Sequence, residues 1–210
     1  MNGIDRLLML REANTAKGAE MRLEARRFLA MAQRHELGTA PRPVIGFNLF
    51  QTPRIIAARM AELITEKAGE GARILEPSAG LGRLFEPLKD LRAEWMIIEE
   101  ARECFDALTK MMKREQVQHR DFLTTTAPEL GGEFDAVIMN PPFKQGRDIK
   151  HILHALEMVK PGGRLVSLCY NGTKQNEQLK PIVNHWEVLP ENSFREEGTS
   201  ASIALIVINK

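Results

Sequence analysis

The chain has 210 residues, of which 43% are hydrophobic and 27% are charged. This length suits one domain of moderate size with a short appendage, and it is too short for two full domains. With 29 Lys and Arg against 28 Asp and Glu the formal net charge is +1. No overall basic field therefore indicates a nucleic-acid partner, although a locally segregated basic surface stays compatible with this total.

Apolar runs and cysteines restrict the class of protein further. The longest apolar runs, at 7–10 and 203–208, hold four to six residues, whereas a membrane-spanning helix needs about 20. Charged residues surround the first run, which is unlike a secretory signal. Cys104 and Cys169 belong to no CxxC or Cys/His cluster, which indicates a reducing compartment and argues against zinc. We therefore expect a cytoplasmic protein without a membrane segment or a metal.

The N-terminal region differs in pattern from the rest. Apolar residues recur at helical spacing through 1–38, for example at Leu7, Leu8 and Phe28, and no strand pattern occurs there. Pro41 and Pro43 follow, and each favours extended geometry in the residue before it. We therefore expect a helical extension with its linker at 1–46 and a main domain at 47–210.

From about residue 50, strand patterns alternate with helix patterns. Thr52 is expected to be the N-cap of the first helix, with Pro53 at the first helical position. The expected helices lie at about 52–68, from about 82, at 101–114 and at 148–159, with turns or loops at 124–132 and 171–185. The expected strands lie at 73–75, 94–99, 117–120, 134–139, 164–170, 186–189 and 203–209. This order predicts an α/β, Rossmann-like, doubly wound fold with a mainly parallel seven-stranded sheet that ends in an antiparallel hairpin.

A turn of small residues follows the first expected strand, in the sequence Ile-Leu-Glu-Pro-Ser-Ala-Gly-Leu-Gly at 74–82. Gly80 and Gly82 can adopt backbone angles closed to other residues, so a ligand can lie against the main chain there. In a doubly wound sheet this turn lies at the carboxyl end of the first strand, where ligands bind. Phe85 occupies the position where a dinucleotide site needs Gly or Ala, which disfavours a nicotinamide cofactor.

Two further strand ends carry acidic residues. Glu99 ends the second expected strand, where a carboxylate can accept hydrogen bonds from vicinal ribose hydroxyls. Asp121 and Phe122 follow the third strand, where the acid can accept from an adenine amino group while the ring packs on the base. A solvated strand end and a turn Asp beside a core Phe are the alternative interpretations.

The sequence Asn140-Pro141-Pro142-Phe143 follows the fourth expected strand. Two consecutive prolines fix their backbone angles and donate no N–H. The Asn140 side chain and the Pro141 carbonyl can therefore be held as acceptors for one planar amino group. Phe143 offers a stacking face for the ring that bears this amine, a contact typically worth about 1–3 kcal/mol.

These segments, over about residues 47–210, resemble class I S-adenosylmethionine-dependent methyltransferases of the amino-methylating group, and they are most like the DNA adenine-N6 methyltransferases. The resemblance implies S-adenosylmethionine as cofactor and Asn140, Pro141, Pro142 and Phe143 as catalytic residues. The residues implied to bind the cofactor are Phe50, Thr52, Pro53, Glu76, Pro77, Ser78, Gly80, Gly82, Glu99, Asp121, Phe122 and Asn140. Those implied to contact the substrate are Phe143, Lys144, Arg147 and Phe194.

The chemistry implied is a direct in-line displacement, in which positioned acceptors pull the amine nitrogen towards tetrahedral geometry. A base in a duplex must first be flipped out of the stack. We expect a local phosphate-binding rim beyond the catalytic loop, although an ordinary solvated face explains the same residues equally well. The expected rim residues are Lys144, Arg147, Lys150, His151, Lys174 and Lys180.

Alternative substrates and partners stay open at this point. DNA is favoured over RNA, and the rival activities are amino-methylation of adenine or guanine in rRNA, or of glutamine in proteins. A non-catalytic module that binds the cofactor or nucleic acid is the alternative of another class. Since no long target-recognition segment is visible, we expect lax or short-site specificity. The alternatives are that the extension at 1–46, the loop at 171–185, a partner protein or a homodimer supplies target recognition.

Overall fold

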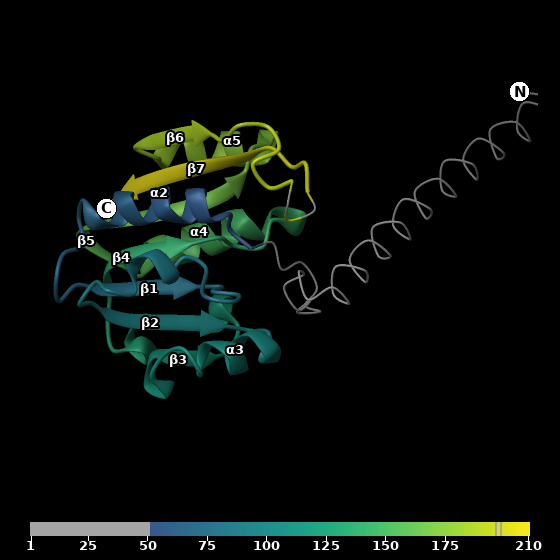
Figure 1. Ribbon diagram of the computed structural model, residues 1–210. Helices are drawn as coiled ribbons and strands as arrows, with labels where there is room; N and C mark the ends of the chain where they lie inside the picture. The colour runs from purple at the N-terminus through teal and green to yellow at the C-terminus, as the bar shows by residue number, and fades with distance from the viewer. Residues whose placement is uncertain (1–50, 196, 198) are drawn as a thin grey trace, which may run out of the picture. The chain divides into compact units, whose positions relative to one another are not determined.

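The computed structural model describes residues 51–195, 197 and 199–210 (Figure 1). The predicted extension at 1–46 and Phe50 lie outside these residues, so the division of the chain into two parts stays a prediction. None of the helices in the described ranges is both long and apolar enough to cross a membrane.

Within the described residues, seven strands form one sheet in the order β3-β2-β1-β4-β5-β7-β6 (Figure 1). Strands β1 to β5 pair in parallel, whereas β7 pairs antiparallel with both β5 and β6. The predicted doubly wound sheet with a C-terminal antiparallel hairpin is therefore confirmed. The strands are β1 (Arg73–Pro77), β2 (Glu94–Glu99), β3 (Val117–His119), β4 (Phe134–Met139), β5 (Val159–Tyr170), β6 (His185–Val188) and β7 (Ile203–Asn209).

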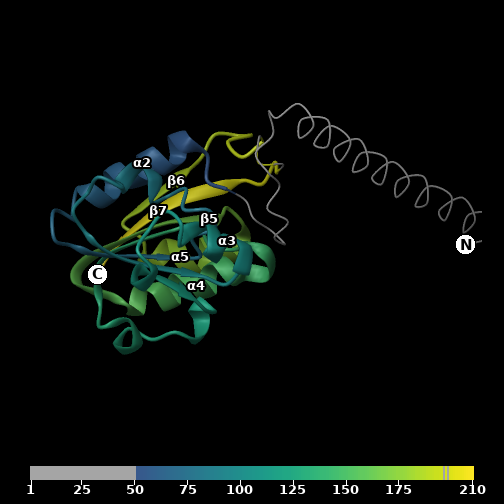
Figure 2. The ribbon, with the colours of Figure 1, turned by 60° about the horizontal axis from the view of Figure 1, so that its bottom comes forward.

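Helices cover both faces of the sheet, as Figure 2 shows for α2 on one side and α4 and α5 on the other. Alternate strand residues divide between two apolar cores: Ile74 and Ile138 pack in the core that includes α2, and Leu75 and Val137 in the core that includes α4. Strands buried on both faces explain the nearly continuous apolar runs of β4 and β7. The helices are α2 (Arg54–Thr65), α3 (Arg102–Leu108), α4 (Arg147–Glu157) and α5 (Thr173–Leu179).

The strand order creates a topological switch point beside β1. The chain proceeds from β1 to β2 and β3 on one side, and then returns to β4 on the other side of β1. In open α/β sheets, ligands bind in the crevice at the carboxyl ends of the strands at such a point. The turn after β1 and the Asn-Pro-Pro-Phe segment after β4 both lie at this end.

Several local predictions are wrong. Strand β5 begins at Val159, five residues before its predicted start at 164. The segment after Gly82 forms turns and a short 3₁₀ helix, η1 (Glu86–Leu88), instead of an α-helix, because Gly82 has φ of 75° and Pro87 donates no N–H. Helix α3 ends at Leu108, six residues before the predicted end. Helix α5 occupies part of the predicted loop at 171–185; its buried residues are only Gln175 and Leu179, so the apolar spacing that predicts a helix is missing.

The start of α2 also differs from the prediction. The N-cap is Pro53, whose carbonyl accepts a hydrogen bond from the Ala57 N–H at 2.9 Å. The Thr52 side chain makes no capping bond and is buried. Its hydroxyl has another partner, described below.

Candidate active site

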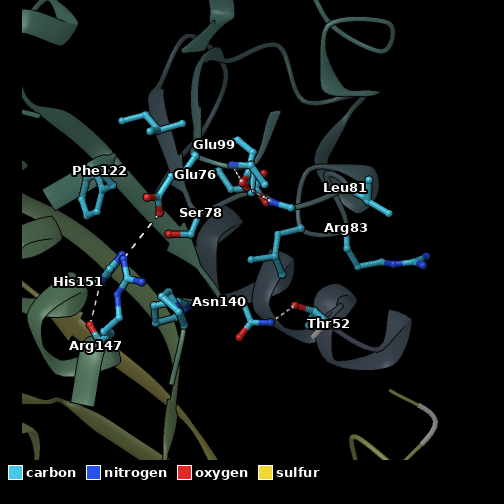
Figure 3. Close-up of a pocket in the computed structure, with 18 of the residues that line it drawn as sticks. Thr52, Glu76, Ser78, Leu81, Arg83, Glu99, Phe122, Asn140, Arg147 and His151 are labelled. Carbon is cyan, nitrogen blue, oxygen red and sulfur yellow. Dashed lines mark hydrogen bonds and ion pairs between the residues drawn. The ribbon is translucent and has the colours of Figure 1, made fainter. Parts of the chain in front are cut away.

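A cavity of about 320 Å³ lies at the carboxyl ends of β1, β2 and β4 (Figure 3). Residues from the turn after β1, the loop after β3, the Asn-Pro-Pro-Phe segment and the first turns of α4 line it. Its size lies in the roughly 300–1,000 Å³ range of small-molecule sites. The cavity therefore joins, in one place, motifs that are separated by almost 100 positions in the sequence.

The turn after β1 has an unusual backbone. Ser78, Gly80 and Gly82 have φ of 79°, 57° and 75°, so every second residue lies in the left-handed region. Ser78 and Gly80 line the cavity, whereas Gly82 does not. A Cβ at Gly82 would lie 3.0 Å from Cδ2 of Leu108. The interpretation of Gly82 as a cofactor contact is therefore not supported: this glycine permits close packing of the turn against α3.

Glu99 connects the turn to the end of β2. Its Oε2 accepts a hydrogen bond from the Gly80 N–H at 2.7 Å, and its Oε1 accepts one from the Ala101 N–H at 2.6 Å. Burial raises the pKa of Glu99, and these two backbone hydrogen bonds oppose the rise. A carboxylate has about four lone-pair sites. Glu99 can thus hold the turn in place and still accept hydrogen bonds from ligand hydroxyls.

Glu76, in β1, is a buried acid that lines the cavity. No described residue donates a hydrogen bond of ordinary geometry to either of its carboxylate oxygens. Burial, and then the negative charge of Glu99, raise the pKa of Glu76 well above 4.5, while the Leu84 backbone N–H acts in the opposite direction. Because an unpaired buried carboxylate is costly, the cavity is suited to a ligand that brings positive charge to Glu76.

Asp121 and Phe122 lie together at the cavity wall after β3. Asp121 is the N-cap of the short 3₁₀ helix η3 (Phe122–Thr124), and its Oδ1 accepts from the Leu123 N–H at 2.9 Å. The Phe122 ring is buried, with its centroid 5.8 Å from that of His151 and 4.8 Å from that of His154. The structure therefore brings both predicted adenine contacts to the cavity.

The Asn-Pro-Pro-Phe segment forms the wall at the end of β4, and all four of its residues line the cavity. The Nδ2 of Asn140 donates a hydrogen bond to Oγ1 of Thr52 at 3.1 Å (Figure 3). This bond orients the amide and connects the Asn-Pro-Pro-Phe segment to the start of α2. Beyond it, Gln145 and Gly146 both have positive φ, and the chain turns sharply into α4.

Several predicted residues lie elsewhere. Pro53, Pro77, Gly82 and Lys144 do not line the cavity, and neither does Phe194. Phe194 is 1% exposed and belongs to the apolar core on the α2 side of the sheet, because the turns at 190–195 fold its ring inward. The interpretation of Phe194 as a substrate contact therefore needs correction.

The residues of the predicted basic rim do not lie together: two of them line the cavity and the others lie outside it. Arg147 lines the cavity, and its guanidinium lies 3.7 Å from Oε2 of Glu100. His151 is 3% exposed and lines the same cavity, so it cannot be part of a surface rim. The remaining expected rim residues are exposed side chains outside the cavity: Lys144, Lys150, Lys174 and Lys180.

Sequence reasoning missed some of the lining residues. Arg83, Glu100 and Arg120 all line the cavity. The Nη2 of Arg83 donates to Oε1 of Gln51 at 2.8 Å. Each of these three residues stands next to a motif residue, which is the one signal in the sequence that could have indicated them. No three His, Cys, Asp or Glu side chains in the described part of the chain group as a metal site would require.

Comparison with known proteins identifies the family. The family model described as "Methyltransferase small domain" matches residues 58–195. The chain belongs to this family. It is an S-adenosylmethionine-dependent methyltransferase of class I, in agreement with the fold and with the cofactor predicted from the motifs.

Individual relatives of this methyltransferase are distant. The rRNA N(6)-adenosine-methyltransferase metl-5 of Caenorhabditis elegans is 27% identical over 153 residues, which cover 67% of this chain and 72% of that protein. A putative class I S-adenosylmethionine-dependent methyltransferase of Listeria monocytogenes has a similar solved structure, with a TM-score of 0.61 and 20% identity, covering 79% of this chain and 63% of that one. A type I restriction-modification methyltransferase subunit of Streptococcus thermophilus gives a TM-score of 0.62 and 17% identity, covering 76% and 44%. The methyltransferase described here thus spans less than two thirds of either solved chain.

The residues of the cavity fit S-adenosylmethionine. This cofactor carries an amino-acid end with an ammonium and a carboxylate, ribose hydroxyls and an adenine. The buried carboxylate of Glu76 complements the ammonium, and Glu99 retains lone pairs for hydroxyl donors. Asp121 and Phe122 offer an acceptor and an aromatic face for a purine.

Proposed function

We propose that this methyltransferase methylates the exocyclic N6 amino group of adenine in a nucleic acid. The observation that carries the proposal is that Asn140, Pro141, Pro142 and Phe143 line the same cavity as the residues that fit the cofactor. A turn that merely ends a strand would not need an amide acceptor before two prolines and an aromatic ring after them.

The chain's own residues act by positioning. The lone pair of an exocyclic amine is delocalised into its ring, so the amine is a poor nucleophile. The Asn140 Oδ1 and the Pro141 carbonyl would accept the two amine hydrogens and draw the nitrogen towards tetrahedral geometry, with the prolines preventing any adjustment of the backbone. Phe143 would stack on the base and hold its plane.

S-adenosylmethionine, when bound, supplies an electrophilic methyl group on its sulfonium. Transfer of this methyl group to the amine would form the N–C bond as the C–S bond breaks, and the amine would then lose one proton to water. Fixed acceptors that match the positive charge developing on the nitrogen lower the barrier without any covalent enzyme intermediate. Cys104 and Cys169 are both buried, and burial raises their pKa to about 11 and about 12. Neither cysteine lines the cavity.

The polymer that carries the adenine has two candidates. DNA is supported by Phe at 143 and by the Phe50-Gln51-Thr52-Pro53 sequence. RNA is supported by the 27% identity to an rRNA N(6)-adenosine-methyltransferase. Because the cavity lies below the surface, a paired base in either polymer would have to be flipped out to reach it.

Methyl transfer from tritium-labelled cofactor to DNA, rRNA and protein pools tests the proposal. Nucleoside analysis of the labelled polymer should give N6-methyladenine, and Asn140→Ala should abolish transfer while the protein still binds S-adenosylhomocysteine. Glu103→Gln, at an exposed position on α3 that does not line the cavity, serves as the control and should transfer normally. Label confined to protein, or to an rRNA nucleoside other than N6-methyladenine, would overturn the proposal.

A further inference from the structure

His151 is a buried histidine on α4 whose role the motifs do not explain. It is 3% exposed, yet it is part of the cavity wall. Its ring centroid lies 5.8 Å from that of Phe122, one of the two residues that offer a surface for a purine. The imidazole therefore lies at the purine end of the cavity (Figure 3).

The hydrogen bonding of His151 determines which of its nitrogens carries a proton. Its Nδ1 lies 2.9 Å from the Arg147 backbone carbonyl, one helical turn earlier. A carbonyl oxygen accepts only, so Nδ1 carries the hydrogen and a neutral imidazole has its lone pair on Nε2. No described residue forms a hydrogen bond with Nε2. Because Nδ1 turns towards its own helix, the edge that carries Nε2 is left for the cavity.

The surroundings of His151 favour its neutral form. Burial lowers its pKa below 6.5, and the positive charges of Arg147 and His154, also on α4, add to this effect. The Arg147 carbonyl and the carboxylate of Asp121, after β3, act in the opposite direction without reversing the shift. The cavity thus presents a neutral imidazole acceptor close to the carboxylate of Asp121.

We propose that Nε2 of His151 accepts a hydrogen bond from the exocyclic amine of the cofactor's adenine, and that His151 thereby makes the site prefer adenine to a 6-keto purine. The amine has two hydrogens, and the cavity offers it two acceptors, His151 and Asp121. A keto oxygen at the same position donates nothing and leaves the lone pair of Nε2 without a donor. This inference rests on the cofactor site and is independent of which polymer is methylated.

Binding of two product analogues to the full chain, measured by calorimetry, tests the proposal. S-adenosylhomocysteine carries the amine, and S-inosylhomocysteine carries a keto oxygen in its place. At pH 8 we expect the wild type to prefer the amine ligand by at least five- to tenfold, the equivalent of one hydrogen bond. At a second, lower pH, at which NMR of its ring protons shows His151 to be protonated, the preference should fall, because protonated Nε2 donates to a keto oxygen and repels an amine. Glu76 and Glu99 face parts common to both ligands, so their titration leaves the ratio unchanged.

Two substitutions at this position separate recognition from packing. His151→Leu, which keeps an apolar contact with Phe122, should lose five- to tenfold in affinity for S-adenosylhomocysteine at pH 8 and show the same preference at both pH values. His151→Gln retains an acceptor that does not titrate, so it should keep most of the affinity while its preference no longer changes with pH. Leu153→Ala, at a 40% exposed position on α4, is the matched control and should behave as the wild type.

Two results would overturn the proposal. One is a wild-type ligand preference that is the same at pH 8 and at the lower pH where His151 is protonated, and the other is a His151→Leu variant that binds both ligands as the wild type does. Both measurements are made without nucleic acid. A negative methyl-transfer assay would therefore not change the outcome of the binding test. A negative binding test would likewise not change the outcome of the methyl-transfer assay.

Discussion

The amide nitrogen of Asn140 donates a hydrogen bond to the hydroxyl oxygen of Thr52 at 3.1 Å, across 88 positions of the sequence. Thr52 is 2% exposed and both residues line the cavity. The bond fixes the rotation of the Asn140 amide, so its oxygen keeps one direction. A residue just before α2 thereby orients the Asn-Pro-Pro-Phe segment that follows β4.

Replacing Thr52 by Val tests this relationship. Val matches Thr in shape but cannot accept the hydrogen bond, so the Asn140 amide would lose its fixed orientation. We expect kcat for methyl transfer to fall by about ten- to a hundredfold, since small misplacements of reacting groups cost this much. Affinity for S-adenosylhomocysteine, measured by calorimetry, should change less than about threefold.

Thr52→Ser is the matched control, because it keeps the hydroxyl and should retain kcat within a few fold. A Thr52→Val variant that loses cofactor affinity but keeps its kcat would contradict the positioning role. It would instead agree with the sequence interpretation of Thr52 as a cofactor contact.

Local sequence predicted much of this site because each motif stands at a strand end. The bounds of β2, β4 and β7 agree with the apolar runs, and parallel strands bring their carboxyl ends to one edge. Glu99, Asp121 and Asn140 therefore meet at one cavity, as predicted. Nothing local to Thr52 predicted its bond to Asn140, because the sequence Thr-Pro is also a typical helix start.

The failures share a physical cause, which is that burial depends on the whole fold. Phe194 is in a polar, turn-rich segment, yet its ring packs in the core. His151 has charged neighbours in the sequence, but the helix turns it towards the cavity. The pairing of Arg147 with Glu100 likewise joins two segments that sequence spacing does not relate.

Glu76→Gln should raise the stability of the ligand-free protein and weaken its binding of cofactor. The pKa of Glu76 is raised, so the folded state keeps a proton that the unfolded chain loses near pH 4.5. The free energy of unfolding therefore falls as the pH rises from about 4.5 through the raised pKa of Glu76. Thermal melts should show Glu76→Gln more stable than the wild type at pH 8 and close to it at pH 5.

The same substitution removes the carboxylate that complements the ammonium at the amino-acid end of the cofactor. Affinity for S-adenosylhomocysteine at pH 8 should fall by about ten- to a hundredfold, as expected for a hydrogen bond to a charged group. Glu103→Gln, at an exposed position, should change neither property. Equal affinity in Glu76→Gln and wild type would show that the buried carboxylate does not contact the cofactor. Some pH dependence of stability should persist in this variant, because burial also raises the pKa of Glu99.

The two aromatic residues Phe143 and Phe194 should respond in opposite ways to substitution. Phe194→Ala creates a cavity in the core and should lower the free energy of unfolding by about 3–5 kcal/mol, whereas Phe194→Leu should cost under about 1.5 kcal/mol and remain active.

Phe143→Ala should lower kcat/KM by about five- to a hundredfold through lost stacking, with a smaller effect on stability. Phe143→Tyr keeps the ring and should stay active. Urea unfolding and methyl-transfer assays measure the two effects, and a selective loss of transfer in Phe194→Leu would restore its predicted substrate role.

Arg147 and Glu100 should act in opposite directions on nucleic-acid binding. Their side chains are 42% and 65% exposed, so the pair contributes under about 1 kcal/mol to stability, and a phosphate can compete for the guanidinium. Arg147→Ala should weaken binding of an adenine-containing oligonucleotide and reduce the slope of log K against log salt by about 1. Glu100→Gln removes the competing carboxylate and should tighten binding. Lys89→Ala is the control, because it removes the same charge at an exposed position. Lys89 lies in the segment that leads to the start of β2, at the opposite end of the strands from the cavity. This variant should leave the slope unchanged. Equal effects of Arg147→Ala and Lys89→Ala would mean that net charge alone, and no contact at the cavity mouth, governs binding.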